Sequence, residues 1–377
     1  MLKIGITGQS GFIGNHIYNK LGLFPEKYDR VIFKKKYFSQ KKKLQEFTAK
    51  CDIIIHLAAI NRCNDLEYLY NTNIELTRRL LAACEFSKSN PHIIFSSSIQ
   101  ENNNSPYGKS KLDSRKVLES WAKKNKSNVT SFLIPNVFGP FCKPNYNSFI
   151  STFSFQLISG NKPSIDIDNE IQLVYIDELV NYIMNYIDKL NRIKHEPNRI
   201  IKIPHTKKIK VSKVLIILKS FAKKYLEYGQ IPNISSDFNR NLFLTFISHI
   251  KYETFFPFFY KINSDNRGSF IEMMRLESGG QISFSTTKPG ITRGNHFHTR
   301  KSERFCVIKG KAKVEIRKIG TKKKYCFKLD SNKPSFIDMP VWYTHNITNI
   351  GDDDLYTIFW ISEHFDEKNP DTFLQTV

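Results

Sequence analysis

The sequence predicts two domains, the first an α/β domain with a doubly wound parallel sheet and the second all-β. Its 377 residues exceed the roughly 100–200 residues of a typical domain. Up to about residue 190, short apolar runs alternate with helical patterns, which is typical of a parallel sheet covered by helices on both faces. From about residue 262, short strand-like runs are separated by turn residues, as in an antiparallel sandwich or barrel. We therefore expect domains at 1–250 and 262–377.

The elements of both domains can be placed from these patterns. In the first domain, strands are expected at 2–6, 31–33, 52–57, 92–95 and 129–134, with helices at 72–87, 107–124, 210–228 and 237–250. In the second domain, strands are expected at 281–286, 304–308, 311–316, 325–329 and 355–361, after a turn at 265–268.

Composition narrows the class of partner and the compartment. The formal net charge is +22, but the lysines are spread along the chain, so we expect polyanionic small molecules rather than nucleic acid as ligands. Six cysteines are scattered without a C-x-x-C pair, which fits a reducing compartment. A strand-like segment begins at once, and no apolar run approaches the roughly 20 residues of a membrane-spanning helix. These features predict a cytoplasmic protein that does not insert into membranes.

A glycine-rich turn follows the first strand, in the stretch Thr7-Gly8-Gln9-Ser10-Gly11-Phe12-Ile13-Gly14. Gly8 allows a tight turn, Gly11 lets the backbone approach a pyrophosphate, and Gly14 allows close packing of helix and strand. The helix N-terminus then faces the phosphates. The pattern predicts a Rossmann-type dinucleotide site. Where NAD-binding proteins carry a carboxylate, the second strand ends in Lys34–Lys36, so we expect Lys34 to favour the 2′-phosphate of NADPH.

A candidate reduction site lies in the helix expected at 107–124. Tyr107 and Lys111 are four residues apart and share one helix face. Because the unperturbed pKa of tyrosine is about 10, we expect the neighbouring cation to lower it and make the phenol a usable acid. A hydroxyl from Ser96-Ser97-Ser98, at the end of the preceding strand, can hold a carbonyl oxygen.

Together these residues resemble the extended short-chain dehydrogenase/reductase family over about residues 1–245. Further matches are His56-Leu57-Ala58-Ala59, Asn73, Pro135–Pro140 and Val174–Asp177. The resemblance implies that Tyr107 donates a proton to the substrate oxygen, that Lys111 also holds the nicotinamide ribose, and that Ser98 rather than Ser97 is the catalytic hydroxyl. It implies cofactor contacts from Thr7, Gly8, Gly11, Phe12, Ile13, Gly14, Leu57, Ala58, Ala59 and Asn73. The usual Val-Tyr-Gly after the serine is replaced by Ile99–Asn102, which suggests a different substrate pocket.

The second domain carries a histidine pattern. Gly290, His296, His298, Glu303 and Gly310 fit G-x5-H-x-H-x4-E-x6-G, and Pro340, His345 and Asn349 fit P-x-G-x2-H-x3-N, with Trp342 in place of the glycine. This resembles the cupin family and implies a small β-barrel that binds a divalent metal through His296, His298, Glu303 and His345. These ligand types suit zinc, iron, nickel or manganese, with zinc as first choice. Alternatively, the histidines fill a barrel mouth. The run 293–297 also resembles the metal-free dTDP-4-keto-6-deoxyhexose 3,5-epimerases, in which that histidine is the base.

The order of the two domains resembles the bifunctional capsular and O-antigen enzymes that make UDP-2-acetamido-2,6-dideoxy-L-talose on the route to UDP-N-acetyl-L-fucosamine. Closer matches include Ser105–Leu112, Cys142–Ser148, Asp265–Phe270 and Lys288–His298. The resemblance implies a homodimer in which the cupin epimerises C3 of a UDP-linked 4-keto-6-deoxy-N-acetylhexosamine and the first domain reduces C4 with NADPH. The epimerisation base stays open among Lys288, Tyr343 and an unliganded histidine.

Three alternatives remain at this point. One is a 4-ketosugar reductase whose cupin is purely structural and mediates dimerisation. Another is an epimerase or dehydratase that keeps NAD bound, although Ile99-Gln100 is not the Asp-Glu pair of such dehydratases. The third is a regulatory sensor, against which Tyr107 and Lys111 argue.

Overall fold

The protein folds into two compact units, each assembled from segments that are distant in sequence. The structure is a computed structural model that describes the chain except residues 191–197, 260–262, 266–267, 271–279, 364–365 and 367. Unit 1 comprises Met1–Phe138, Asn145–Ser148 and Glu170–Ile209. Unit 2 comprises Gly139–Pro144, Phe149–Asn169 and Lys210–Val377.

Unit 1 is built on a six-stranded parallel sheet. Its strands are β1 (Leu2–Thr7), β2 (Tyr28–Val31), β3 (Ile53–His56), β4 (His92–Ser98), β5 (Val129–Ile134) and β8 (Asn198–Lys202), in the order β2-β1-β3-β4-β5-β8. The order reverses at β1, which pairs with β2 on one side and β3 on the other. In such sheets ligands bind at the carboxyl ends of the strands beside this switch point.

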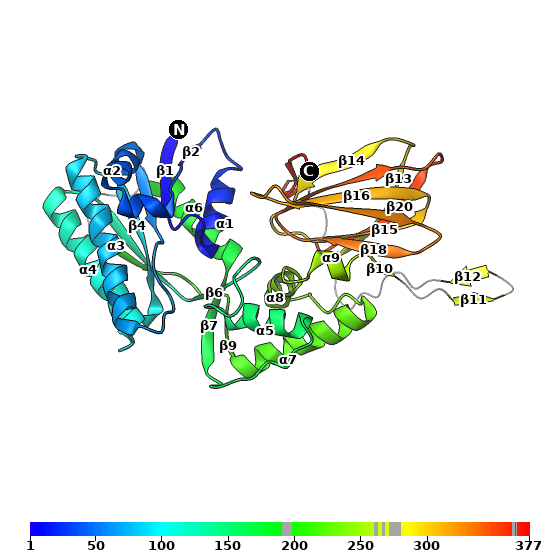
Figure 1. Cartoon of the computed structure of the whole chain (residues 1–377), viewed down its shortest axis with the longest axis horizontal. Helices are drawn as coiled ribbons and strands as arrows, with labels where there is room; N and C mark the ends of the chain where they lie inside the picture. Colours follow the sequence, from blue (N-terminus) through cyan, green and yellow to red (C-terminus); the bar gives the residue numbers. More distant parts are fainter. Residues whose placement is uncertain (191–197, 260–262, 266–267, 271–279, 364–365, 367) are drawn as a thin grey trace. The chain divides into compact units, whose positions relative to one another are not determined.

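Helices cover both faces of this sheet (Figure 1). On one face α2 (Lys41–Lys50), α3 (Leu66–Phe86) and α4 (Pro106–Asn125) pack in succession, and on the other α1 (Phe12–Leu21) packs against α6 (Ile176–Lys189). Short 3-10 helices, η1 (Lys35–Ser39) and η2 (Ile99–Asn102), follow β2 and β4. A smaller sheet joins β6 (Asn136–Phe138), β7 (Glu170–Tyr175) and β9 (Lys207–Lys210). The expected doubly wound α/β fold is confirmed.

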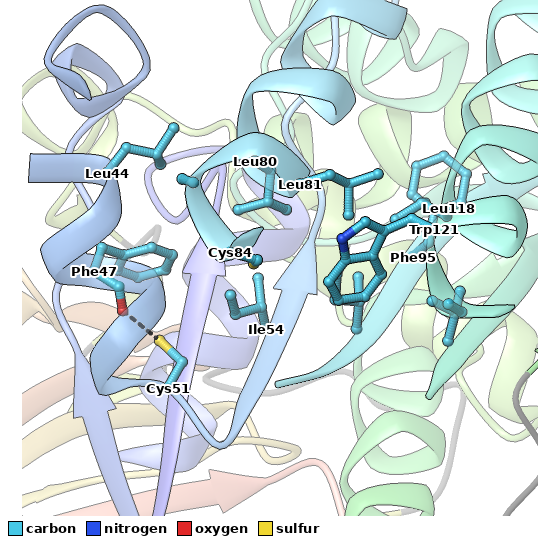
Figure 2. Close-up of a cluster of buried hydrophobic side chains, with 14 of the residues drawn as sticks. Leu44, Phe47, Cys51, Ile54, Leu80, Leu81, Cys84, Phe95, Leu118 and Trp121 are labelled. Atoms are coloured by element: carbon cyan, nitrogen blue, oxygen red, sulfur yellow. Dashed lines mark hydrogen bonds between the residues drawn. The ribbon is translucent and has the colours of Figure 1, made fainter. Parts of the chain in front are cut away.

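A continuous apolar core lies beneath α2, α3 and α4 (Figure 2). Phe47, Leu80, Leu118 and Trp121 from the three helices meet Ile54 and Phe95 of the sheet in this core. Gly5 of β1 permits this packing, because a Cβ there would lie 2.4 Å from the Phe47 ring. Burial of these side chains supplies the main driving force for holding the helices on the sheet.

Unit 2 combines a helical part with two antiparallel sheets. The helices are α5 (Phe149–Ile158), α7 (Val211–Phe221), the π-helical turn η4 (Ala222–Glu227), α8 (Asp237–Ile247) and α9 (Tyr252–Phe255). α5 packs against both α7 and α8. Among the described residues, no helix combines the length and the apolar character needed to cross a membrane.

The two five-stranded sheets face each other as an all-β body. One has the order β10 (Phe258–Phe259), β18 (Ser335–Met339), β15 (Glu303–Lys309), β20 (Leu355–Ile361), β13 (Gln281–Thr287). The other has the order β17 (Lys324–Asp330), β16 (Lys311–Lys318), β19 (Tyr343–Asn349), β14 (Thr292–Phe297), β21 (Phe373–Leu374). β11 (Asn263–Asp265) and β12 (Gly268–Phe270) pair antiparallel. The expected all-β class of the second part is confirmed.

A buried ion pair ties the helical part of unit 2 to its first sheet. Arg304 of β15 is 0% exposed, and its Nε donates to Asp338 Oδ1 at 2.8 Å while Nη2 donates to Oδ2 at 3.1 Å. Its Nη1 donates to the Gly229 carbonyl at 2.5 Å, just beyond η4. The guanidinium carbon lies 3.7 Å from the centre of the Phe336 ring. Bidentate pairing and stacking compensate the desolvation of this cation.

One expected strand is displaced, and one expected turn falls partly outside the described residues. β2 ends at Val31, whereas the sequence predicted a strand at 31–33. The reason is that the Phe33 N–H donates to Gln9 Oε1 of the glycine-rich turn at 3.0 Å instead of to a strand. The expected turn at 265–268 includes Asn266 and Arg267, which lie outside the described residues.

Candidate functional site

The glycine-rich turn lies at the carboxyl end of β1, beside the switch point. Gly8 has a φ of +78°, and the Gly11 N–H donates to the Gly8 carbonyl at 2.9 Å. A Cβ at Gly14 would lie 2.3 Å from that carbonyl oxygen, so only glycine fits there. Phe12 and Ile13 form the first turn of α1 and are half-buried. The expected roles of Gly8 and Gly14 thus have a geometric basis.

A buried hydrogen-bond network links this turn to the loop after β3. Thr7 Oγ1 lies 2.7 Å from His56 Nδ1, and His56 Nε2 lies 3.2 Å from Thr77 Oγ1. Burial, followed by the charge of Lys111, lowers the pKa of His56 to about 3. This imidazole therefore stays neutral. Its two ring nitrogens link the end of β3 to Thr7 of β1 and to Thr77 of α3.

The loop residues expected to contact the cofactor are half-buried beside this network. Leu57, Ala58 and Ala59 follow β3, and the Ala58 N–H donates to Thr7 Oγ1 at 3.4 Å. Asn73 is buried on α3, accepts from the Ile60 N–H at 2.7 Å and donates to the Ile60 carbonyl at 3.0 Å. The Asn73 side chain therefore holds the loop in place by binding the backbone of Ile60.

Lys34 is exposed three residues after the end of β2, immediately before η1, at the same edge of the sheet as the glycine-rich turn. Its neighbour Phe33 is bound to Gln9 of that turn. The cation expected to favour a 2′-phosphate is thus held within the same loop cluster as Gly8 and Gly11.

Tyr107 and Lys111 lie on one face of α4, as predicted. The Lys111 Nζ is 5.8 Å from the centre of the Tyr107 ring and donates to the Ser96 carbonyl at 2.8 Å. Burial lowers the pKa of Lys111 to about 8. The expectation of a lowered tyrosine pKa is wrong in this structure, because burial, followed by the nearby Tyr146, raises the pKa of Tyr107 to about 12. The phenol is therefore poised as a proton donor rather than as a phenolate.

The three serines of β4 are buried and have different partners. Ser96 Oγ donates to the His56 carbonyl at 3.3 Å, and Ser98 Oγ accepts from the Gln100 N–H at 3.1 Å. Ser97 donates to the buried carboxylate of Glu101. Among the described residues Ser98 Oγ is engaged only as an acceptor, so its proton can be directed to a ligand.

An ion pair that the sequence reasoning missed binds η2 to α4. Arg115 Nε donates to both oxygens of Glu101, at 3.1 and 3.0 Å, and Nη1 donates to Glu119 at 2.6 Å. At Gly108, a Cβ would lie 2.1 Å from the Gln100 carbonyl. The departure from the family pattern at Ile99–Asn102 thus creates a close, clamped contact with the helix that carries Tyr107. The i,i+4 spacing of Arg115 and Glu119 was the only visible sequence signal.

In unit 2 the four predicted metal ligands converge. One ligand atom from each of His296, His298, Glu303 and His345 lies within 4.8 Å of the others. His296 of β14 pairs with His345 of β19, at 4.7 Å between ring centres, and His298 follows the end of β14. Glu303 begins β15 in the facing sheet, so it comes from across the body rather than from a neighbouring strand of the same sheet.

The donor set fits a divalent metal. His298 Nε2, Glu303 Oε2 and His345 Nε2 are buried and make no hydrogen bond of acceptable geometry, although His345 Nε2 lies 3.0 Å from Glu303 Oε2. Burial opposes ionisation of Glu303, but the two histidines outweigh it and lower its pKa. Burial and the other two histidines lower the pKa of His296 to about 4. Neutral imidazoles and an ionised carboxylate are the forms that bind zinc and similar cations.

Trp342 replaces the glycine of the cupin pattern in a backbone conformation that its contacts stabilise. It has a φ of +62°, a backbone region that favours glycine, which accounts for the glycine in the family motif. The Trp342 N–H donates to the His298 carbonyl at 2.8 Å, and its ring stacks on Phe297 at 5.5 Å. These contacts hold the strained residue in place beside the cluster.

The three candidates for the epimerisation base differ in their exposure to solvent. Lys288 is exposed ahead of β14, whereas Tyr343 is buried and stacks on Tyr252 at 5.5 Å. Among the histidines of unit 2 outside the cluster is His249, whose pKa burial lowers to about 4. Sequence reasoning missed Lys318, which pairs with Tyr343 in register and lies 3.7 Å from the centre of the Phe141 ring. Burial lowers the pKa of Lys318 to about 8.

The parallel sheet and its glycine turn define a dinucleotide-binding protein, and comparisons with known proteins agree. The profile of the NAD dependent epimerase/dehydratase family matches residues 4–203, and that of the polysaccharide biosynthesis C-terminal domain matches residues 263–373. A Pseudomonas aeruginosa protein named UDP-2-acetamido-2,6-beta-L-arabino-hexul-4-ose reductase is 34% identical over 387 residues, covering 100% of this chain and 99% of the relative.

Solved structures extend this similarity. The capsular polysaccharide assembling protein CapF from Staphylococcus aureus is 32% identical, with a TM-score of 0.60 and 100% of both chains covered. A UDP-glucose 4-epimerase from Thermotoga maritima, 19% identical with a TM-score of 0.54, covers 66% of this chain and 98% of its own, and shares the fold of the first part. The chain belongs to the NAD dependent epimerase/dehydratase family, among members that also carry a polysaccharide biosynthesis C-terminal domain. The full-length resemblance inferred from the sequence is confirmed.

Proposed function

We propose that the protein is a bifunctional nucleotide-sugar enzyme of surface polysaccharide biosynthesis. Its all-β part epimerises C3 of a UDP-linked 4-keto-6-deoxy-N-acetylhexosamine, and unit 1 reduces C4 with NADPH, on the route to UDP-N-acetyl-L-fucosamine. The observation that carries the reductase assignment is the full-length relationship to a protein named as a reductase of a UDP-linked hexul-4-ose. The enzyme acts as a homodimer in the cytoplasm, where its six free cysteines would stay reduced.

The residues of unit 1 supply acid catalysis and orientation. When bound, NADPH supplies the hydride that adds to C4. Tyr107, protonated because its pKa is about 12, donates its proton to the C4 oxygen, so that the ketone becomes a secondary alcohol. The Lys111 cation stabilises the phenolate that Tyr107 leaves behind, and Ser98 donates a hydrogen bond to the same oxygen. The exposed Lys34 would pair with the 2′-phosphate and so favour NADPH over NAD.

The cluster of unit 2 supports the epimerase assignment. His296, His298, Glu303 and His345 would hold the divalent metal, with zinc as first choice. A bound metal supplies Lewis acidity, which makes the C–H next to a ketone easier to deprotonate. A base of this chain would remove the C3 proton, and return of a proton to the opposite face inverts the carbon. Epimerisation must precede reduction, because the ketone supplies the acidity.

The reductase reaction should depend on pH through Lys111. Its pKa of about 8 in the folded protein means that it loses its charge as the pH rises through 8. Because the cation stabilises the phenolate, kcat/KM for NADPH oxidation should fall above about pH 8. Stability should move in the opposite direction, since the unfolded chain binds more protons than the folded one between pH 8 and the ordinary lysine pKa of about 10.4. Initial rates and thermal unfolding measured between pH 6 and 10 test both trends, and a flat rate profile would contradict the role of Lys111.

The two activities can be separated in deuterated water. Protein, NADPH and a UDP-4-keto-6-deoxy-N-acetylhexosamine should give NADPH oxidation together with deuterium at C3 of the product. The His296→Ala variant should lose C3 exchange, because an imidazole of the cluster is gone, and should keep NADPH oxidation of a substrate that already has the product configuration at C3. Nuclear magnetic resonance and absorbance at 340 nm read the two steps.

The outcomes distinguish the main alternative. Exchange that survives His296→Ala, or that never occurs, favours a 4-ketosugar reductase whose all-β part is structural and mediates dimerisation. Absence of NADPH oxidation with any UDP-4-ketohexose would contradict the reductase assignment itself.

A further inference from the structure

We propose that residues Asp371–Gln375, here called the strap, position the histidine cluster for metal binding. The inference rests on the proposed metal site of unit 2. None of these residues is a ligand candidate, and the first of them follows His298 by 73 positions in sequence. The strap nevertheless contacts neighbours of every ligand in the cluster.

The first contact sets the orientation of one imidazole. His298 Nδ1 lies 2.5 Å from the backbone carbonyl oxygen of Asp371, and both residues are buried. Since a carbonyl only accepts, Nδ1 must carry the hydrogen and donate it. Nε2 is then left with its lone pair on the side of Glu303, whose Oε1 lies 3.4 Å away. A hydrogen bond of this kind from the second nitrogen fixes both ring orientation and tautomer in metal-binding histidines.

The second contact holds the loop between two ligand candidates. The Asp371 carboxylate accepts from the backbone N–H of Thr299 at 3.2 Å, of Arg300 at 2.8 Å and of Lys301 at 3.2 Å. It also accepts from the Thr299 hydroxyl at 2.6 Å. This loop leads from His298 to Glu303, so one carboxylate fixes the chain that connects them.

The third set of contacts reaches the other two histidines. β21 pairs with β14, with His296 opposite Leu374. The Gln375 N–H donates at 2.8 Å to the carbonyl of Asn295, the bulged residue with a φ of +55° that precedes His296. The Thr344 hydroxyl donates to the Gln375 carbonyl, directly before His345. The strap therefore holds the backbone on which His296 and His345 are mounted.

Asp371 itself is suited to a positioning role. Its side chain is surrounded by donors, it is 4% exposed, and its φ is +45°. A non-glycine residue in this region of φ persists when surrounding contacts enforce it. A carboxylate whose oxygens already accept from three backbone N–H groups holds the loop in its conformation.

The test measures zinc binding to the full chain. Asp371→Ala should weaken zinc binding about 10–100-fold, as loss of outer partners of metal ligands typically does, measured by competition with a chromogenic chelator. Thr299→Val removes a single hydrogen bond to Asp371 with little change of shape and should weaken binding by a smaller factor. Asp330→Ala is the matched control, because Asp330 accepts a backbone N–H from Asn332 in a turn outside the strap and should leave zinc binding unchanged.

Each outcome bears on the proposal separately from the metal site itself. If the wild-type chain binds no zinc, the proposed metal site is wrong. If the wild type binds zinc and both Asp371→Ala and Thr299→Val bind it as tightly, the strap has no positioning role. Should Asp371→Ala fail to fold by circular dichroism, Thr299→Val decides: unchanged zinc affinity overturns the proposal, and weakened affinity with an intact fold supports it.

Discussion

Tyr107→Phe is expected to lower NADPH oxidation by about 10²–10⁴-fold, the range over which a positioned acid contributes to catalysis. The substitution removes only the phenol oxygen, so the ring keeps its place 5.8 Å from the Lys111 Nζ. Without the phenol, the C4 oxygen gains negative charge with no group to protonate it, although the proposed hydrogen bond from Ser98 remains. Binding of NADPH should change little, so the loss should appear in kcat rather than in the dissociation constant for the cofactor.

A second tyrosine provides the matched control. Tyr70 of α3 donates to Asp113 of α4 at 2.7 Å and belongs to no part of the proposed site. Tyr70→Phe should cost about 1 kcal/mol of stability, the usual worth of one hydrogen bond, and leave the rate unchanged. Deuterium exchange at C3 should survive Tyr107→Phe, because that step belongs to unit 2. Near wild-type NADPH oxidation by Tyr107→Phe would rule out the assigned proton donor.

Asp338→Ala is expected to lower the free energy of unfolding of unit 2 by about 3–5 kcal/mol, the cost of breaking a buried ion pair by removing one partner. Arg304 has no exposure to water, so its cation would lose its bidentate carboxylate partner while staying buried beside the Gly229 carbonyl and aromatic rings. Since domains are typically stable by about 5–15 kcal/mol, this is a large share. Chemical denaturation followed by near-ultraviolet circular dichroism measures it.

An exposed ion pair and a double variant complete this test. Glu315→Ala removes the partner of Lys313, whose Nζ lies 3.0 Å away on a partly exposed surface, and should cost about 0–1 kcal/mol. Replacing both members of the buried pair, as Arg304→Met with Asp338→Leu, should recover much of the loss, because no charge is then left buried. If the double variant is less stable than Asp338→Ala, the penalty does not come from the unpaired cation.

The features that the sequence predicted well depend on local spacing. Gly8 and Gly14 are six residues apart in one turn, and Tyr107 and Lys111 share a helix face through the period of the α-helix. His296 and His298 come together in the same way, because both lie on or directly after one strand. In each case, regular secondary structure converts a spacing in sequence into proximity in space.

The features that could not be predicted depend on contacts between distant segments. Glu303 meets the histidines from the facing sheet, and nothing in its spacing distinguishes that position from a neighbouring strand. The end of β2 depends on Gln9, 24 positions before its partner Phe33. The pKa of Tyr107 is raised by burial and by Tyr146, and neither can be predicted from the spacing of Tyr107 and Lys111. Asp371 belongs to the same class, since its partners lie 70–73 positions earlier.

The way the chain passes repeatedly from one unit to the other has a consequence for synthesis on the ribosome. α5 ends at Ile158, but its partner α8 ends at Ile247, 89 residues later. At a translation rate of about 5–20 residues per second, α5 would wait about 4–18 s for that partner. During this interval α5, whose Ile150 and Phe153 are buried in the finished protein, lacks one of the two helices that pack against it. Until α8 is complete, the apolar surface of α5 is therefore available to chaperones and to aggregation.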